Sequence, residues 1–230
     1  MVCSQVLKRK KKACTVIPII LILFIDSSRS GFEKREKRRQ IRKLQDAITE
    51  KDVSCVKEIL QDEFDVDFQY RGQTALQQAV REGQEEICQL LIDKGADINK
   101  SDAELNSLLN IACQYGHESI AELLIKHKAD VNAANDFNSS PMSTCAITGN
   151  KTIADLLYCA NCDLNLTNQK GETPLFVATK NRNLVMVEFL IHCNCSIGVG
   201  DENDSTEMIV AAELGYTEIL KFLMEHACKF

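Results

Sequence analysis

Residues Arg71 to Asn99, RGQTALQQAVREGQEEICQLLIDKGADIN, set out a layout that the chain repeats every 33 residues. From Thr74, steps of this length reach a hydroxyl residue each time, at Ser107, Ser140, Thr173 and Thr206. From Leu91, the same steps reach Leu124, Leu157, Leu190 and Leu223. Because several positions keep one period without slippage, the sequence predicts a stacked repeat protein rather than a globule with a single core.

Each repeated position has a residue type that suits one place in a pair of short helices. The Thr or Ser is predicted to cap the first helix, where its side-chain oxygen accepts a hydrogen bond from a free backbone amide. Pro141 and Pro174 follow it, at the first helical position, where a missing N–H costs nothing. A glycine is predicted to end this helix with a positive φ, at Gly83, Gly116, Gly149 and Gly215. A second helix follows, with apolar residues at helical spacing such as Ile87, Leu90 and Leu91.

Two peptides resemble the ankyrin repeat: TPLFVATKN, from Thr173 to Asn181, and DKGADIN, from Asp93 to Asn99. The resemblance implies an all-α ankyrin-repeat solenoid of about six helix–turn–helix units with short β-turn tips. We expect the array over residues 44–230. Its units are expected at about 44–68, 71–100, 104–133, 137–166, 170–199 and 203–230.

The sequence departs from the family pattern at two positions. The residue that is usually histidine in the first helix is here Gln77, Asn110, Ser143, Phe176 and Ile209. The hydrogen bonds that the family's histidine makes are therefore not assured in this chain. In addition, Leu105 stands where Gly72 and Gly171 stand in other units. It is predicted to hold a positive φ at an energetic cost.

Charge is distributed unevenly along the chain. The first 43 residues hold 13 Lys and Arg against 3 Asp and Glu, whereas the remaining 187 hold 14 against 30. A surface that binds phosphates needs clustered Lys and Arg. The acidic array therefore argues against a nucleic-acid partner and favours a protein partner with a basic segment.

Residues 1–31 form a leader with a basic cluster, Lys8 to Lys12, followed by the mostly apolar run from Ala13 to Ile25. Three interpretations stay open: a signal peptide, a segment that contacts a membrane surface, and a disordered leader without a role in the fold. A membrane-spanning helix is disfavoured, because the run has thirteen residues, includes Pro18, and falls short of the ~20 that a span needs.

Residues 32–43, FEKREKRRQIRK, are predicted to be a basic helix. We interpret it as a cap on the array, since terminal repeats need a polar outer surface. A solvated helix face, a nuclear-import signal and a lipid contact are alternatives that the sequence leaves open.

The eleven cysteines are predicted to be packing residues, because many fall in small or apolar repeat positions. These include Cys55, Cys145, Cys162, Cys195 and Cys228. The alternative is a metal or redox site formed by Cys159 and Cys162 with Cys193 and Cys195. It is disfavoured because successive units lie ~10 Å apart, too far for one tetrahedral zinc.

No catalytic motif, metal site or cofactor site is predicted, so we expect a protein that is not an enzyme. The resemblance implies binding through the first helices and the turn tips, which line a concave groove. The predicted partner-binding residues are Tyr70, Arg71, Gln77, Arg81, Gln114, Tyr115, Asp136, Phe137, Phe176 and Lys180. Aromatic residues dominate interface hot spots, which is why the tyrosines and phenylalanines are included.

The sequence thus predicts a cytoplasmic or otherwise intracellular scaffold or adaptor that binds a protein partner. The alternative is a membrane-tethered or secreted array directed by the leader. The sequence does not determine the partner's identity or the oligomeric state.

Cell fractionation of the full chain and of a variant without residues 1–30 separates these two predictions. If the array acts in the cytoplasm, both proteins will be recovered in the soluble cell fraction in the same proportion. Recovery of only the full chain with membranes or in the medium would instead favour the leader-directed form.

Overall fold

The structure is a computed structural model that describes residues 38–61, 65–102 and 104–227. The chain divides into two units, Met1–Asp46 and Ala47–Phe230. In the first unit the described residues, 38–46, are helical. The predictions for residues 1–31 and for 32–37 of the basic helix lie outside the described residues, as does Cys228.

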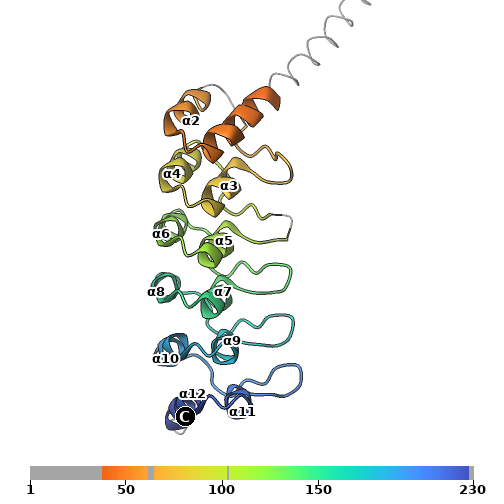
Figure 1. Cartoon of the computed structure of the whole chain (residues 1–230), viewed down its shortest axis with the longest axis vertical. Coiled ribbons are helices and arrows are strands. Elements are labelled where there is room, and N and C mark those ends of the chain that lie inside the picture. Colours follow the sequence, from red (N-terminus) through yellow and green to blue (C-terminus); the bar gives the residue numbers. More distant parts are fainter. Residues whose placement is uncertain (1–37, 62–64, 103, 228–230) are drawn as a thin grey trace, which may run out of the picture. The chain divides into compact units, whose positions relative to one another are not determined.

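The second unit is built from paired helices that follow one another in chain order (Figure 1). The helix after residues 47–49 is α2, Val53–Ile59. The first helices of the later pairs are α3 (Ala75–Arg81), α5 (Leu108–Tyr115), α7 (Pro141–Thr148), α9 (Pro174–Lys180) and α11 (Glu207–Glu213). The second helices are α4 (Glu85–Asp93), α6 (Glu118–Lys126), α8 (Lys151–Cys159), α10 (Leu184–His192) and α12 (Thr217–Ala227).

Each first helix from α3 to α11 contacts its own second helix, and successive first helices contact one another. The second helices likewise form a continuous row from α2 to α12. The loops between pairs project to one side of the stack (Figure 1). The described residues contain an isolated β-bridge, Tyr70 with Gln73, at one loop tip but no strand. The predicted all-α repeat solenoid is confirmed.

The caps form where the sequence predicts them. The hydroxyls of Thr74, Ser107, Ser140 and Thr173 each accept a hydrogen bond from the amide three residues on. Thr206 makes no such bond, so the last first helix lacks this cap. The glycines that end the first helices have positive φ, between 72° and 79°. The predicted caps are therefore correct in four of the five pairs, and all four predicted glycine ends are correct.

A second row of positive φ angles lies in the loops, and it includes Leu105. The φ angles of Gly72 and Gly171 are 81° and 75°, and Leu105 adopts 55° at the equivalent place. The leucine side chain is 54% exposed. A positive φ is energetically unfavourable for an L-amino acid, and the exposed side chain makes few packing contacts that could offset this cost.

Side-chain oxygens join each unit to the next. The oxygen of Asn99 accepts the amide of Asp130 at 3.0 Å, and that of Asn132 accepts the amide of Asp163 at 2.9 Å. The same link recurs one unit before and one unit after, from the Asp97 amide to Asp67 and from the Ser196 amide to Asn165. These bonds tie backbone amides to a neighbouring unit and fix the stacking register.

In two units, the first-helix position that is usually histidine in the family holds a side chain that is hydrogen-bonded to the following loop. The side-chain amide of Gln77 donates to the Lys100 carbonyl at 3.1 Å, and that of Asn110 donates to the Ala133 carbonyl at 2.8 Å. Both amides thus join the first helix to the loop that follows its unit. No comparable bond is observed for Phe176 at the same position in the described part of the chain.

No helix within the described residues is long and apolar enough to cross a membrane.

Replacement of Leu105 by glycine is expected to raise the free energy of unfolding by about 0.5–1 kcal/mol. Removal of the Cβ relieves about 1–2 kcal/mol of left-handed strain, while the entropy of glycine in the unfolded chain costs about 0.5–1 kcal/mol. Urea unfolding of the full chain measures the change. Leu105→Ala is the control, because it also removes the exposed side chain but keeps the Cβ. If both substitutions changed the free energy of unfolding by the same amount, backbone strain at Leu105 would not be the cause.

Candidate protein-binding surface

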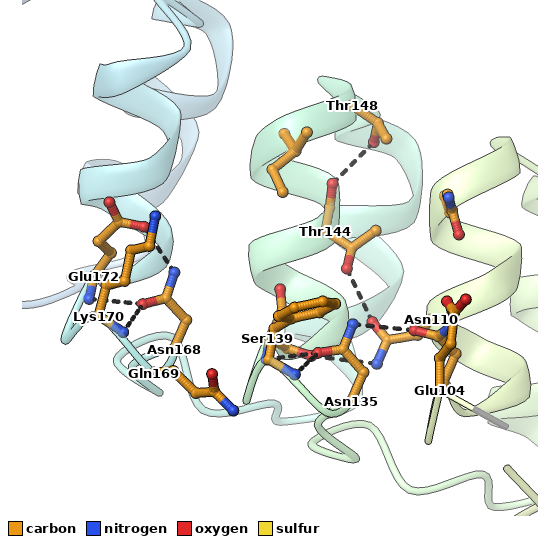
Figure 2. A pocket seen from close by; sticks show the side chains of 14 residues that line it. Glu104, Asn110, Asn135, Ser139, Thr144, Thr148, Asn168, Gln169, Lys170 and Glu172 are labelled. Carbon is orange, nitrogen blue, oxygen red and sulfur yellow. Dashed lines mark hydrogen bonds between the residues drawn. The ribbon is translucent and has the colours of Figure 1, made fainter. Parts of the chain in front are cut away.

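A concave site lies between the loops and the first helices of successive units. It is a groove of about 460 Å³, which we call the central groove (Figure 2). It is lined by Glu104, Asn106, Asn110, Gln114, Asn135, Phe137, Ser139, Thr144, Ile147, Thr148, Asn168, Gln169, Lys170 and Glu172. These residues come from α5, α7 and the loops that follow residue 102, so the stacking of the units creates the groove.

An asparagine or aspartate organises each loop beside the groove. Asn135 Oδ1 accepts the amides of Phe137 and Ser139, both at 3.0 Å (Figure 2). Asn168 does the same for Lys170 and Glu172. Because short polar side chains bond the backbone two residues on, they favour such turns. Each loop tip is thereby held in one conformation.

Backbone hydrogen bonds also join neighbouring tips. The Asp136 amide donates to the Glu104 carbonyl at 3.2 Å, and the Gln169 amide donates to the Phe137 carbonyl at 3.0 Å. The Glu202 amide continues the row with a bond of 2.9 Å to Lys170. The tip residues Glu104, Phe137 and Lys170 therefore form an ordered row.

Two apolar side chains of the groove are strongly exposed. Phe137 on a loop tip is 65% exposed, and Ile147 near the end of α7 is 55% exposed. Most polar side chains around them are already hydrogen-bonded, for example Thr144 to Asn110 at 2.9 Å. Large apolar side chains exposed in a concave site are typical of surfaces that bind another protein.

Two ion pairs lie near the loop tips, and the acid of one of them, Glu172, lines the central groove. Arg81 lies 3.2 Å from Asp102, and Lys180 lies 2.6 Å from Glu172. Partial burial by itself raises the pKa of Glu172, but hydrogen bonds from Lys180 and Asn168 outweigh it and leave that pKa below its usual value. Glu172 is therefore held as a carboxylate with its counter-charge in place.

The structure brings only some of the predicted binding residues together. Gln114 and Phe137 line the central groove, and Lys180 reaches it through Glu172. Arg71 and Arg81 line a smaller pocket of about 140 Å³, which Glu104 also borders.

The other three predicted residues that are not buried, Tyr70, Tyr115 and Asp136, line neither of these two pockets. The Tyr115 ring stacks on His117, with centroids 6.0 Å apart. The Arg71 guanidinium lies 5.3 Å from the centre of the Tyr70 ring. Asp136 is exposed at a tip.

The expectation that Gln77 and Phe176 are surface residues is wrong. Their side chains are 1% and 2% exposed. Gln77 is directed to the Lys100 carbonyl and caps the Thr74 amide, at 3.1 Å and 2.8 Å. Phe176 is packed inside the stack at the equivalent position. Neither side chain is available to a partner.

Ile147 is a groove residue that the sequence prediction omitted. It lies 33 residues after Gln114 and 33 before Lys180, both of which were predicted to bind. Extension of that row through every unit identifies it. Glu104 and Lys170 are the equivalents of the predicted Phe137 one unit before and one unit after it, so the same extension identifies them.

The cysteine positions agree with packing. Cys145, Cys162 and Cys195 are 0%, 8% and 3% exposed, as predicted, whereas Cys55 is half-buried. Burial raises the pKa of the Cys162 and Cys195 thiols to about 12. These thiols therefore stay protonated at neutral pH and are poor nucleophiles. Across the described ranges, no group of three or more His, Cys, Asp or Glu is arranged to hold a metal ion.

Glu207, the first residue of α11, is the one fully buried carboxylate among the described residues. Its Oε2 accepts the Gly198 amide at 2.9 Å, while Oε1 has no hydrogen-bond partner. Burial raises the pKa of this carboxyl group above its usual value. Units with Ala75, Pro141 or Pro174 at the same position avoid this cost.

The raised pKa of Glu207 gives a sign for the pH dependence of stability. The folded state holds the proton more tightly than the unfolded chain. This tighter proton binding adds to the free energy of unfolding. The added stability is fully present below the pKa that Glu207 has in the unfolded chain, and it is lost as pH rises through the pKa of the folded state. Glu207→Gln is expected to be more stable than the wild type at pH 7 and to lose less stability between pH 4.5 and 7.

Thermal unfolding at several pH values measures this difference. Glu213→Gln is the matched control, because Glu213 lies on the same helix but is exposed. A pH dependence that Glu207→Gln leaves unchanged would contradict the burial of an unfavourable charge.

Comparisons with known proteins agree with the fold. The sequence matches the family model described as ankyrin repeats (3 copies) over residues 34–102, 100–168 and 142–230. The crystal structure of EF0377, an ankyrin repeat protein, is similar with a TM-score of 0.75 and 31% sequence identity. The alignment covers 80% of this chain and 97% of that one. A comparison with curated proteins finds no match.

Proposed function

The chain belongs to the ankyrin repeat family, whose members generally serve as protein–protein interaction modules, and we propose that it is a non-catalytic scaffold or adaptor. In this proposal it binds a protein partner through the central groove and the turn tips. The observation that carries the proposal is the pair of exposed apolar side chains, Phe137 and Ile147, inside the groove.

Rigidity of the groove supports this role. The Phe137 amide is bonded to Asn135, and its carbonyl accepts the Gln169 amide of the next unit. Ile147 lies on a helix that packs between two others. A surface that is ordered before binding loses little conformational entropy when a partner docks, which favours affinity.

The charge of the array supports a partner with a basic segment. Residues 44–230 hold 30 Asp and Glu against 14 Lys and Arg. Such a surface attracts cationic segments at long range and increases the rate of association at low salt. Binding in the cytoplasm, where scaffolds and adaptors of this kind act, is part of the proposal.

Phe137→Ala and Ile147→Ala are each expected to reduce capture of the partner about tenfold, since loss of a hot-spot side chain costs ~1–2 kcal/mol or more. The measurement is affinity purification with the full-length chain as bait, with captured proteins quantified against wild type. The same proteins are then retested in purified form by calorimetry.

Val185→Ala is the matched control. Val185 is 54% exposed, as strongly as Ile147, but it lies on α10 in the row of second helices. Each variant is first shown to unfold at the wild-type temperature. If Val185→Ala weakened binding as much as the groove variants did, or if neither groove variant weakened it, the groove would not be the binding surface.

A further inference from the structure

Two acidic residues lie near Phe137, the one aromatic side chain that lines the central groove: Glu104 lines the groove as well, and Asp136 lies next to Phe137 in the sequence. Phe137 is 65% exposed, and Asp136 precedes it on the same tip. Glu104 lies on the neighbouring tip, which the Asp136 amide contacts through the Glu104 carbonyl at 3.2 Å. We call Glu104, Asp136 and Phe137 the anchor subsite.

The two acids of the anchor subsite lack a cation. In the part of the chain that the structure describes, neither Glu104 nor Asp136 has a basic group within 4.0 Å. The acids nearby differ, because Asp102 is paired with Arg81 and Glu172 with Lys180. The subsite therefore carries negative charge that the chain does not neutralise.

Lys170, the basic residue that lines the groove, does not remove this charge. It belongs to the next tip, beyond Phe137, and its carbonyl accepts the amide of Glu202 at 2.9 Å. The acidic Glu202 thus lies beside Lys170, just as Asp136 lies beside Glu104. On the Glu104 side, Arg71 and Arg81 share the smaller pocket with Glu104, but Arg71 lies over the Tyr70 ring and Arg81 is paired with Asp102.

We propose that the anchor subsite binds an arginine side chain of the partner, with its guanidinium against the Phe137 ring and paired with Glu104 and Asp136. This inference rests on the proposed function, which supplies a protein partner, and adds the chemistry by which that partner is recognised. Ile147 lines the same groove, and in this proposal it contacts the apolar residue next to the arginine.

Arginine matches the subsite better than other side chains. Its planar guanidinium stacks on an aromatic face and donates to carboxylates at the same time, whereas lysine is a compact charge with a tighter hydration shell. An aliphatic side chain would cover Phe137 but remove water from the carboxylates without replacing their hydrogen bonds, which is unfavourable. An acidic side chain would be repelled.

The test uses two blocked tetrapeptides, glycine–arginine–leucine–glycine and its analogue with citrulline in place of arginine. Citrulline has nearly the same shape as arginine but no charge. Each peptide is titrated to millimolar concentration into the ¹⁵N-labelled full chain under reducing conditions, and amide shifts are followed by NMR. The arginine peptide is expected to shift the amides of residues 104–106 and 135–138 and to bind at least about threefold more tightly than the citrulline peptide.

Three variants assign the interaction. The doublet Glu104→Gln/Asp136→Asn is expected to remove the preference for arginine. Phe137→Leu keeps an apolar side chain and should weaken the arginine peptide about two- to fivefold, the range of an exposed cation–π contact. Glu118→Gln/Glu122→Gln changes the charge equally on exposed positions of α6 and should leave the preference unchanged.

The outcomes separate this inference from the proposed function. Equal binding of the two peptides, no shifts at residues 104–106 and 135–138, or an effect of the α6 doublet as large as that of the subsite doublet would overturn the arginine subsite. If Phe137→Ala still reduced capture of the protein partner in that case, the groove would remain the binding surface and only its chemistry would be wrong. If the arginine peptide were not preferred and the groove variants also captured the partner as well as the wild type did, both proposals would be overturned.

Discussion

Every unit of this protein depends on its neighbours to satisfy its backbone and bury its apolar side chains. The amides of Asp130 and Asp163 are bonded not within their own unit but to Asn99 and Asn132 of the unit before. The first helices are similarly enclosed between those of the adjacent units, with Ala79, Ala112 and Cys145 fully buried. A helix pair of this size lacks a core of its own, so stability arises mainly at the contacts between units.

This dependence explains why the groove has its particular composition. The register between units is fixed by the asparagine side chains and by the bonds between tips, and these consume most of the polar groups near the concave surface. Phe137, Ile147 and the charges at the tips are not needed for stacking, so they remain available to another molecule. The same constraint buries Gln77 and Phe176, although both lie on first helices near the groove.

Residues that depart from the repeat carry identifiable costs, and some have local compensation. Arg182 replaces the glycine that ends other first helices and holds a φ of 55°, but its guanidinium lies 5.6 Å from the centre of the Tyr216 ring. Leu105 and Glu207 lack comparable compensation, since one is exposed and the other has an unpartnered carboxylate oxygen. An array tolerates such costs because each affects mainly one unit and its two interfaces.

The sequence alone determined the repeat, four of the five hydroxyl caps, the positive φ of Leu105 and the packing role of Cys145, Cys162 and Cys195. These follow from local rules for helix ends and from a period that brings equivalent residues into equivalent environments. Only the tertiary structure decided which predicted binding residues are accessible. A position within the repeat does not show what the next unit places against it, so Phe137 and Phe176 looked alike in the sequence. One is exposed at a tip and the other is enclosed by its neighbours, because burial in a stack is a property of two units and not of one.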